Sequence, residues 1–309
     1  MRHNPSDEIR TAIKQIRQLT NNPFAVNLFI PEKHYATNEQ IEYARKIVQT
    51  SCHELNFDVP AINPPYAPAF EEQMNAILEE KIPIFTFTFG IPSSHWIETF
   101  KKNRIKLIGT ATTLEEAVLL EKYGIDAIVA QGSEAGGHRG TFIGKAENAL
   151  MGISSLISLL VEHIKIPIIA AGGIMGAKDI MGSLTLGGSA VQMGTAFLAC
   201  AESGIHPACK KLLLNIPRDN TTLTRAFSGK LARGIINKFI IRMQSHENII
   251  LDYPIQNALT SSMRKEAGKQ NNTDFVSMWA GQASYLCKEL PASQLIKKLN
   301  DEVMALLNM

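Results

Sequence analysis

Residues 127–140 read AIVAQGSEAGGHRG, a short apolar run that leads into a segment with four glycines. An uncharged run such as 127–130 is typical of a strand that is covered on both faces of a parallel sheet. The glycines let the backbone adopt positive φ and approach a flat ligand closely. His138 is the side chain of this segment suited to proton transfer near neutral pH. The pattern predicts an α/β barrel whose site lies at the C-terminal ends of its strands.

Five more apolar runs recur along the chain, and longer amphipathic stretches separate them. This alternation indicates repeated strand–helix units around a parallel sheet. Thr37 and Thr113 each precede acidic residues, so we expect a helix to begin after each of them. The expected strands are 24–29, 84–89, 105–108, 127–130, 166–170 and 190–193.

The C-terminal third of the chain lacks this alternation. Residues 203–215 predict a helix, 217–230 a loop, and 256–309 helices with polar breaks. We expect one domain over 1–309, with a barrel core in 1–202 and with the last barrel helix and a dependent cap in 203–309. A closed barrel of this kind needs eight strands. The predicted fold class is therefore α/β, a TIM-type (β/α)8 barrel, N-terminally truncated to about six strands, with a C-terminal helical cap.

Composition argues against several classes of protein. The 309 residues carry a formal net charge of +2 without a basic stripe, so neither nucleic acid nor a membrane surface is expected as the main partner. The sequence has no apolar run long enough for a membrane span and no signal core, which predicts a cytoplasmic protein. The four cysteines lie far apart, which predicts reduced thiols. No metal-ligand spacing is present, so we expect no metal.

Two further apolar runs end in glycine, AAGGI at 170–174 and QMGTAF at 192–197. They belong to the last two predicted strands, where barrel enzymes commonly hold a phosphate with backbone N–H groups. Neither segment contains a basic residue, so peptide dipoles would hold the anion. The two segments together predict a phosphate cradle that includes Gly172 and Gly173.

Asn27 lies near the end of another apolar run, PFAVNLF at 23–29. A buried amide without hydrogen-bond partners costs about 1–3 kcal/mol. The edge of a flavin ring would supply both donors and acceptors for it. Neighbouring backbone is the alternative source of partners.

These four segments, in this order, resemble the nitronate monooxygenase family, formerly called 2-nitropropane dioxygenases. The resemblance extends over nearly the whole chain, and the tail WAGQ at 279–282 is similar to the closing helix of the family. It implies a (β/α)8 barrel with non-covalent FMN. In that arrangement Asn27 and Gln131 contact the isoalloxazine or ribityl group, and Gly136 packs near the ring. The residues implied at the ribityl phosphate are Gly173, Gln192, Met193, Gly194 and Thr195.

The resemblance also implies a role for His138, as the base that takes the α-proton of a nitroalkane or positions the nitronate. The implied substrates are a small nitronate and O2, and the products are a carbonyl compound and nitrite. Two alternatives stay open. One is an FMN-dependent NAD(P)H:quinone or enoyl-thioester reductase, and the other is a truncated inactive paralogue that needs a partner or a homodimer for stability.

Family members open with a strand, a helix and a second strand before the segment that corresponds to the start of this chain. We therefore expect a start codon that is set too late, or a truncated gene. A barrel left open in this way exposes two parallel edges, which is unfavourable for a monomer.

Overall fold

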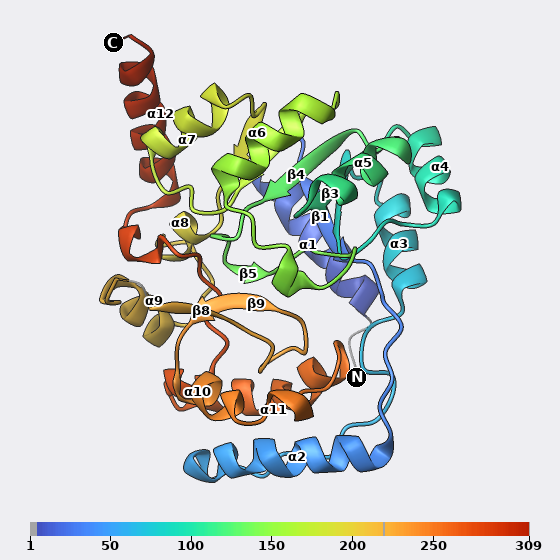
Figure 1. Ribbon diagram of the computed structural model, residues 1–309, viewed down its shortest axis with the longest axis vertical. Coiled ribbons are helices and arrows are strands. Elements are labelled where there is room, and N and C mark those ends of the chain that lie inside the picture. The colour runs from blue at the N-terminus through green and yellow to red at the C-terminus, as the bar shows by residue number, and fades with distance from the viewer. Residues whose placement is uncertain (1–4, 219, 309) are drawn as a thin grey trace.

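The computed structural model describes residues 5–218 and 220–308, and a six-stranded parallel sheet forms its centre (Figure 1). The six predicted strands are confirmed, with small shifts at their ends. Strands β1 and β7 are the two edges of this sheet within the described residues. In spatial order the strands are β1 (Ala25–Phe29), β2 (Ile84–Thr88), β3 (Lys106–Ala111), β4 (Ala127–Gln131), β6 (Ile168–Ala171) and β7 (Ala190–Gln192).

Alternation along the strands sorts their side chains onto two faces. Phe85 and Phe87 of β2 and Leu107 of β3 are fully buried in the main hydrophobic core, beneath the surrounding helices. The intervening residues Thr86 and Thr88 are half-buried and line an internal cavity. The apolar face therefore anchors the helices, while the polar face is left for a ligand.

Helices connect the strands and cover the outer face of the sheet. Thr37 and Thr113 cap their helices as predicted, because their hydroxyl groups accept from the backbone N–H of Gln40 and Glu116 at 3.2 Å. Leu295 and Leu299 of the last helix pack against the barrel beside α7. These outer helices are α1 (Pro5–Leu19), α3 (Phe70–Glu79), α4 (Ser94–Lys102), α5 (Leu114–Lys122), α6 (Ile153–His163), α7 (Ala177–Thr185) and α12 (Ala292–Leu307). The short α8 (Thr195–Leu198) instead follows β7 at the end of the sheet, where Thr195 and Leu198 line the cavity.

A second, antiparallel sheet lies between the barrel strands and the cap, and the sequence did not predict it. It joins β5 (Gly137–His138), β9 (Ala232–Ile235) and β8 (Thr221–Thr224) in that order. The prediction of a loop over 217–230 is wrong where β8 lies. The helix expected over 203–215 is shorter, α9 (Pro207–Leu214). In this sheet β8 and β9 are neighbours in the sequence, but β5 pairs with β9 across more than ninety residues, which no local pattern reveals.

The cap contains α10 (Lys238–Gln244) and α11 (Ile255–Lys269), and α2 (Asn38–Cys52) packs beneath them (Figure 1). Val48 of α2 lies in one buried cluster with Phe239 and Met263. Helix α2 thus belongs by packing to the cap, although it falls within the 1–202 range expected for the barrel core. Among the described residues there are also 3-10 helices, at His53–Leu55, Ala146–Asn148, Glu247–Ile249, Thr273–Phe275 and Ser284–Leu286.

Three further features of the described residues concern their helices, their cysteines and their groups of metal-ligating side chains. None of their helices has the length and apolar character needed to cross a membrane. All four cysteines are free. In residues 5–218 and 220–308, no group of three or more His, Cys, Asp or Glu side chains is arranged to hold a metal ion.

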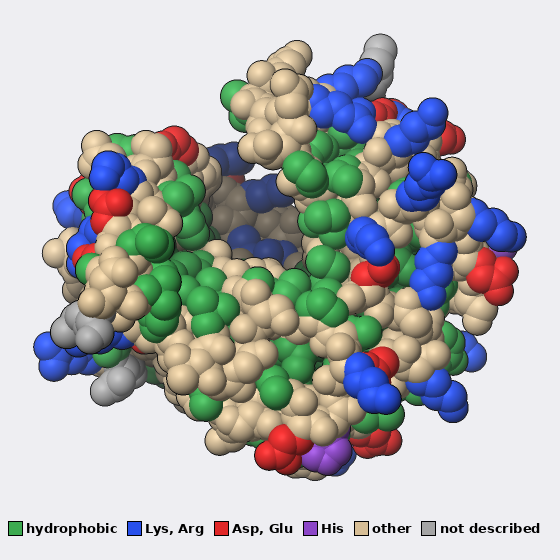
Figure 2. All heavy atoms as spheres, turned by 90° about the horizontal axis from the view of Figure 1, so that it is seen from above, with side chains coloured by type: hydrophobic (Ala, Val, Ile, Leu, Met, Phe, Trp, Pro, Cys, Tyr) green, Lys and Arg blue, Asp and Glu red, His purple; other side chains and the backbone are tan. Residues whose placement is uncertain are grey.

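Figure 2 shows one face of the molecule hollowed between two lobes, with Lys and Arg side chains in the depth of the hollow.

Candidate active site

A cavity of about 450 Å³ lies at the C-terminal ends of the parallel strands. Its volume falls within the range of pockets that hold cofactors and small ligands. The cavity brings together all but one of the residues predicted to bind the cofactor. Those that line it are Asn27, Gln131, Gly136, Gly172, Gly173, Gln192, Gly194 and Thr195. Met193 does not, because its side chain packs in the apolar clusters with Ile180.

Glycine keeps one wall of this cavity open. Gly172 and Gly173 have φ of +118° and +71°, a region that other residues adopt only under strain. A Cβ built on Gly137 or Gly194 meets no atom within 4 Å, so the backbone there faces open space. Within the described chain, the N–H groups of Gly173, Gly194 and Thr195 donate to no protein acceptor. These free donors fit an anion such as a phosphate.

Two amide side chains at the strand ends have partners within the protein. Gln131 donates through Nε2 to the carbonyl of His138 at 2.9 Å, and its Oε1 accepts from the N–H of Gly140 at 2.8 Å. The Oδ1 atom of Asn27 accepts from the hydroxyl of Thr86 at 3.0 Å. The partner of Asn27 is thus a side chain on the adjacent strand and not the neighbouring backbone that the sequence offered as an alternative. Gln131 fixes the loop that follows its own strand.

The segment 279–282 closes the cavity, but it does not form the helix that the resemblance implied. Trp279 forms a bridge to Gly234, and the N–H of Gly281 donates to the Thr195 hydroxyl at 3.0 Å. A Cβ on Gly136 would lie 2.5 Å from the backbone of Ala280 and Gly281. The glycine at 136 therefore permits the closing segment to pack against the loop.

His138 lies next to the cavity wall rather than in it. It follows Gly137, which lines the cavity, and its ring centroid is 5.4 Å from that of Trp279, which also lines it. Three more aromatic rings surround the imidazole, with centroids 5.7, 5.8 and 6.5 Å away. They belong to Phe29, Phe89 and Tyr253. The Nε2 atom of His138 lies 2.8 Å from the hydroxyl of Ser228.

This apolar setting changes the protonation of His138. Burial lowers the pKa of the imidazole to about 4, and the positive charges of Lys230 and Arg264 add to the effect. The ring is therefore neutral at physiological pH. The sequence suggested a group that titrates near neutrality, and the structure corrects that expectation.

Two buried charged residues hold the loop that carries His138. Arg139 is 1% exposed and donates to the carbonyls of Gln131 and Ala149, each at 3.0 Å, and to that of Gly132. Burial lowers the pKa of its guanidinium to about 10, so it stays charged. The carboxylate of Glu116 accepts from the backbone N–H of Phe142 at 2.5 Å and from three further donors. The loop is thus fastened at both ends.

Sequence reasoning missed several residues around the imidazole, among them Phe89, Ser228, Lys230 and Tyr253. Phe89 carries a usable signal in the sequence, because it ends the predicted run 84–89 and precedes a glycine. In the structure it follows β2, and its backbone has φ of +75°. Left-handed backbone in a bulky residue is uncommon and tends to occur at functional sites. The Nζ atom of Lys230 lies 4.2 Å from the centroid of the Phe89 ring.

Comparisons with known proteins agree with this arrangement. The family model described as nitronate monooxygenase matches residues 3–302. A probable nitronate monooxygenase of Staphylococcus haemolyticus is 41% identical over 302 residues, which cover 97% of this chain and 85% of the relative. One from Staphylococcus aureus strain MSSA476 is 42% identical over 300 residues, with 96% and 84% covered.

Two solved structures are similar to this chain in fold. A nitroalkane oxidase from Streptomyces ansochromogenes has a TM-score of 0.89 at 34% identity, covering 97% of this chain and 86% of its own. FabK from Thermotoga maritima has a TM-score of 0.74 at 28% identity, with 98% and 83% covered. The sequence match, the parallel sheet and the glycine-walled cavity all agree: the chain belongs to the nitronate monooxygenase family of flavin-dependent oxidoreductases.

Proposed function

We propose that this protein oxidises alkyl nitronates and nitroalkanes with O2 to a carbonyl compound and nitrite, using FMN. The observation that carries the proposal is the glycine-walled cavity, which has unpaired backbone donors at one end and His138 beside it. A nitroalkane oxidase of known structure shares this fold at 34% identity. The free thiols suit a reducing compartment, and we place the enzyme in the cytoplasm.

The cavity fits FMN in its charge pattern as well as its size. No Lys or Arg side chain is among its described lining residues, so the phosphate would rest on the N–H groups of Gly173, Gly194 and Thr195. The polar strand residues Thr86, Thr88 and Thr110 face the same space and offer hydroxyl groups to the rest of the cofactor. When bound, a flavin supplies the electron acceptor that protein side chains lack.

The proposed role of His138 is to accept the α-proton of a nitroalkane or to position a nitronate. Its lowered pKa keeps the ring unprotonated and able to accept a proton, but it also makes the ring a weak base. A nitronate has already lost the α-proton. We therefore expect nitronates to be oxidised faster than the corresponding neutral nitroalkanes.

The test begins with the cofactor released from the purified protein, whose mass should be that of FMN. O2 consumption and nitrite release are then measured with propyl-2-nitronate and with 2-nitropropane. Formation of nitrite together with a carbonyl compound supports the proposal. Oxidation of NADH with a quinone or an enoyl-thioester, without nitrite from either nitro compound, would replace it by a reductase.

A further inference from the structure

The hydroxyl of Ser228 is placed against His138 by the pairing of two short strands. His138 of β5 lies opposite Ala232 of β9, and Ser228 precedes that strand in the loop from β8. This register brings the hydroxyl to 2.8 Å from the Nε2 atom of the imidazole. Ser228 is 2% exposed, so water does not compete for the contact.

The other contacts of Ser228 indicate the direction of this hydrogen bond. Its hydroxyl donates to the carbonyl of Lys230 at 3.2 Å and accepts from the N–H of the same residue at 3.3 Å. A serine has a single proton to donate. The Lys230 carbonyl can only accept, whereas the Nε2 atom of His138 can donate or accept, depending on the tautomer. Placing the single hydroxyl proton toward the Lys230 carbonyl leaves the hydroxyl to accept from His138. The Nε2 atom then carries the proton, and Nδ1 is left unprotonated.

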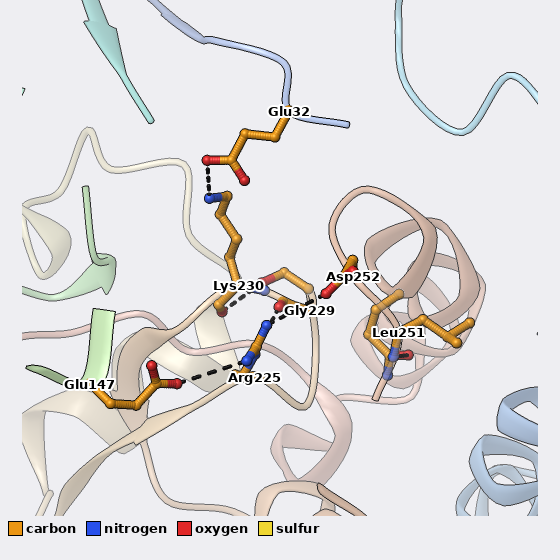
Figure 3. Close-up of polar contacts among 9 residues, drawn as sticks. Glu32, Glu147, Arg225, Gly229, Lys230, Leu251 and Asp252 are labelled. Carbon is orange, nitrogen blue, oxygen red and sulfur yellow. Dashed lines mark hydrogen bonds and ion pairs between the residues drawn. The ribbon is translucent and has the colours of Figure 1, made fainter. Parts of the chain in front are cut away.

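The loop that carries Ser228 is fastened independently of His138, as Figure 3 shows for its neighbours. Arg225 donates through Nε to the carbonyl of Gly229 at 3.0 Å, and its other nitrogens lie 3.8 Å from Glu147 and 3.6 Å from Asp252. Gly229 has φ of +85°, and a Cβ there would lie 2.2 Å from the carbonyl oxygen of Leu251. This close approach fixes the loop against the segment at Leu251.

Lys230 secures the other end of the same loop. Its ammonium group forms an ion pair with Glu32 at 2.8 Å and lies over the Phe89 ring. Ser228 is therefore held between two anchored residues, before any substrate arrives. A hydroxyl that is fixed in advance can select one form of the imidazole.

We propose that Ser228 is a positioning residue that selects the Nε2–H tautomer of His138 and so leaves Nδ1 as the nitrogen that takes the substrate proton. In the described part of the chain, Nδ1 has no hydrogen-bond partner, as this role requires. The inference rests on the proposed function of His138 in the preceding section.

The first test is ¹⁵N NMR of histidine-labelled, flavin-loaded protein at neutral pH. We expect the wild-type ring to show a protonated Nε2 and an unprotonated Nδ1, and Ser228→Ala to give a mixture of both tautomers. Ser228→Thr keeps the hydroxyl and should restore the wild-type pattern. Ser183→Ala removes another buried serine hydroxyl, which donates to the Asp179 carbonyl at 2.9 Å, and should leave the tautomer unchanged. A wild-type ring protonated at Nδ1 overturns the proposal.

The second test is kinetic and uses the same variants. Ser228→Ala should lower kcat for a neutral nitroalkane on the order of 10- to 100-fold, with KM and flavin content close to wild type. Ser228→Thr should recover most of the rate. An unchanged kcat in Ser228→Ala contradicts the positioning role. If His138→Ala also keeps full activity, the proposed function of His138 fails instead, and the NMR result still decides which nitrogen Ser228 engages.

Discussion

The side chain of Gln131 is bonded to the backbone of His138, with 2.9 Å between Nε2 and the carbonyl oxygen. Its Oε1 atom holds the N–H of Gly140, so one amide fastens both sides of the loop that carries the imidazole. Gln131, the last residue of β4, thereby fixes the position of His138 relative to the sheet. This contact connects the core strand to the proposed proton acceptor.

Replacing Gln131 by Met, which has a similar length, should release this loop. Both hydrogen bonds are lost, and each is worth about 1 kcal/mol. We expect lower stability in urea denaturation together with a lower kcat. Gln49→Met is the matched control, because Gln49 also donates through Nε2 to a carbonyl, that of Phe57, and accepts through Oε1 from an N–H, that of Val59, without contact with this loop. Equal losses of kcat in the two variants would contradict a special role for Gln131 in placing His138.

Replacing His138 by Ala should slow the oxidation of a neutral nitroalkane by about 10²–10⁴-fold, the usual contribution of a positioned base. The loss on a pre-formed nitronate should be smaller, since the α-proton is already gone. Flavin should stay bound, because His138 is not among the residues that line the cavity. Steady-state rates on both substrates measure the difference. His95→Ala, at an exposed site on α4, serves as the control.

The protonation of His138 should also make stability depend on pH. Its pKa is lowered from 6.5 to about 4 in the folded protein, so the unfolded chain binds more protons between these values. Stability should therefore rise with pH from about 4 to 6.5, by about 3 kcal/mol from this residue, and be lost as pH falls through that window. Denaturant titrations of wild type and His138→Gln across this range measure it. Identical pH dependence of the two proteins would be inconsistent with a buried neutral imidazole.

Gly194→Asp should abolish flavin retention. A side chain at this position enters open space, so the substitution adds a negative charge to the cavity where the phosphate is proposed to lie. Gly194→Ala adds only a methyl group and keeps the backbone N–H, and it should retain the flavin. The visible absorbance of the two purified variants measures how much flavin each of them retains. Flavin bound at wild-type level by Gly194→Asp would place the phosphate elsewhere.

Local pattern was sufficient to predict the barrel half of the fold. Runs such as residues 127–130 are apolar because helices cover one face and the barrel interior the other. Parallel strands of this kind can be recognised from the local sequence. Gly137, Gly172 and Gly173 were equally visible, since each has a positive φ, which favours glycine strongly over other residues. The residues of the cavity wall that were predicted lie at the ends of such runs or in these glycine segments.

The surroundings of His138 were not predictable in the same way. The contact with Ser228 depends on pairing between β5 and β9, whose partners are separated by about ninety residues in the sequence. The burial that lowers the pKa of the imidazole comes from Phe29, Tyr253 and Trp279, three rings from distant segments. A motif shows which residue is present, but only the assembled structure shows its protonation.

The most direct test of the proposed function is anaerobic mixing of the flavin-loaded protein with propyl-2-nitronate while the visible flavin absorbance is recorded. We predict that the nitronate bleaches the flavin and that O2 then restores the absorbance. A flavin that stays oxidised with the nitronate, but is bleached by NADH, would contradict nitronate oxidation and assign the site to a reductase.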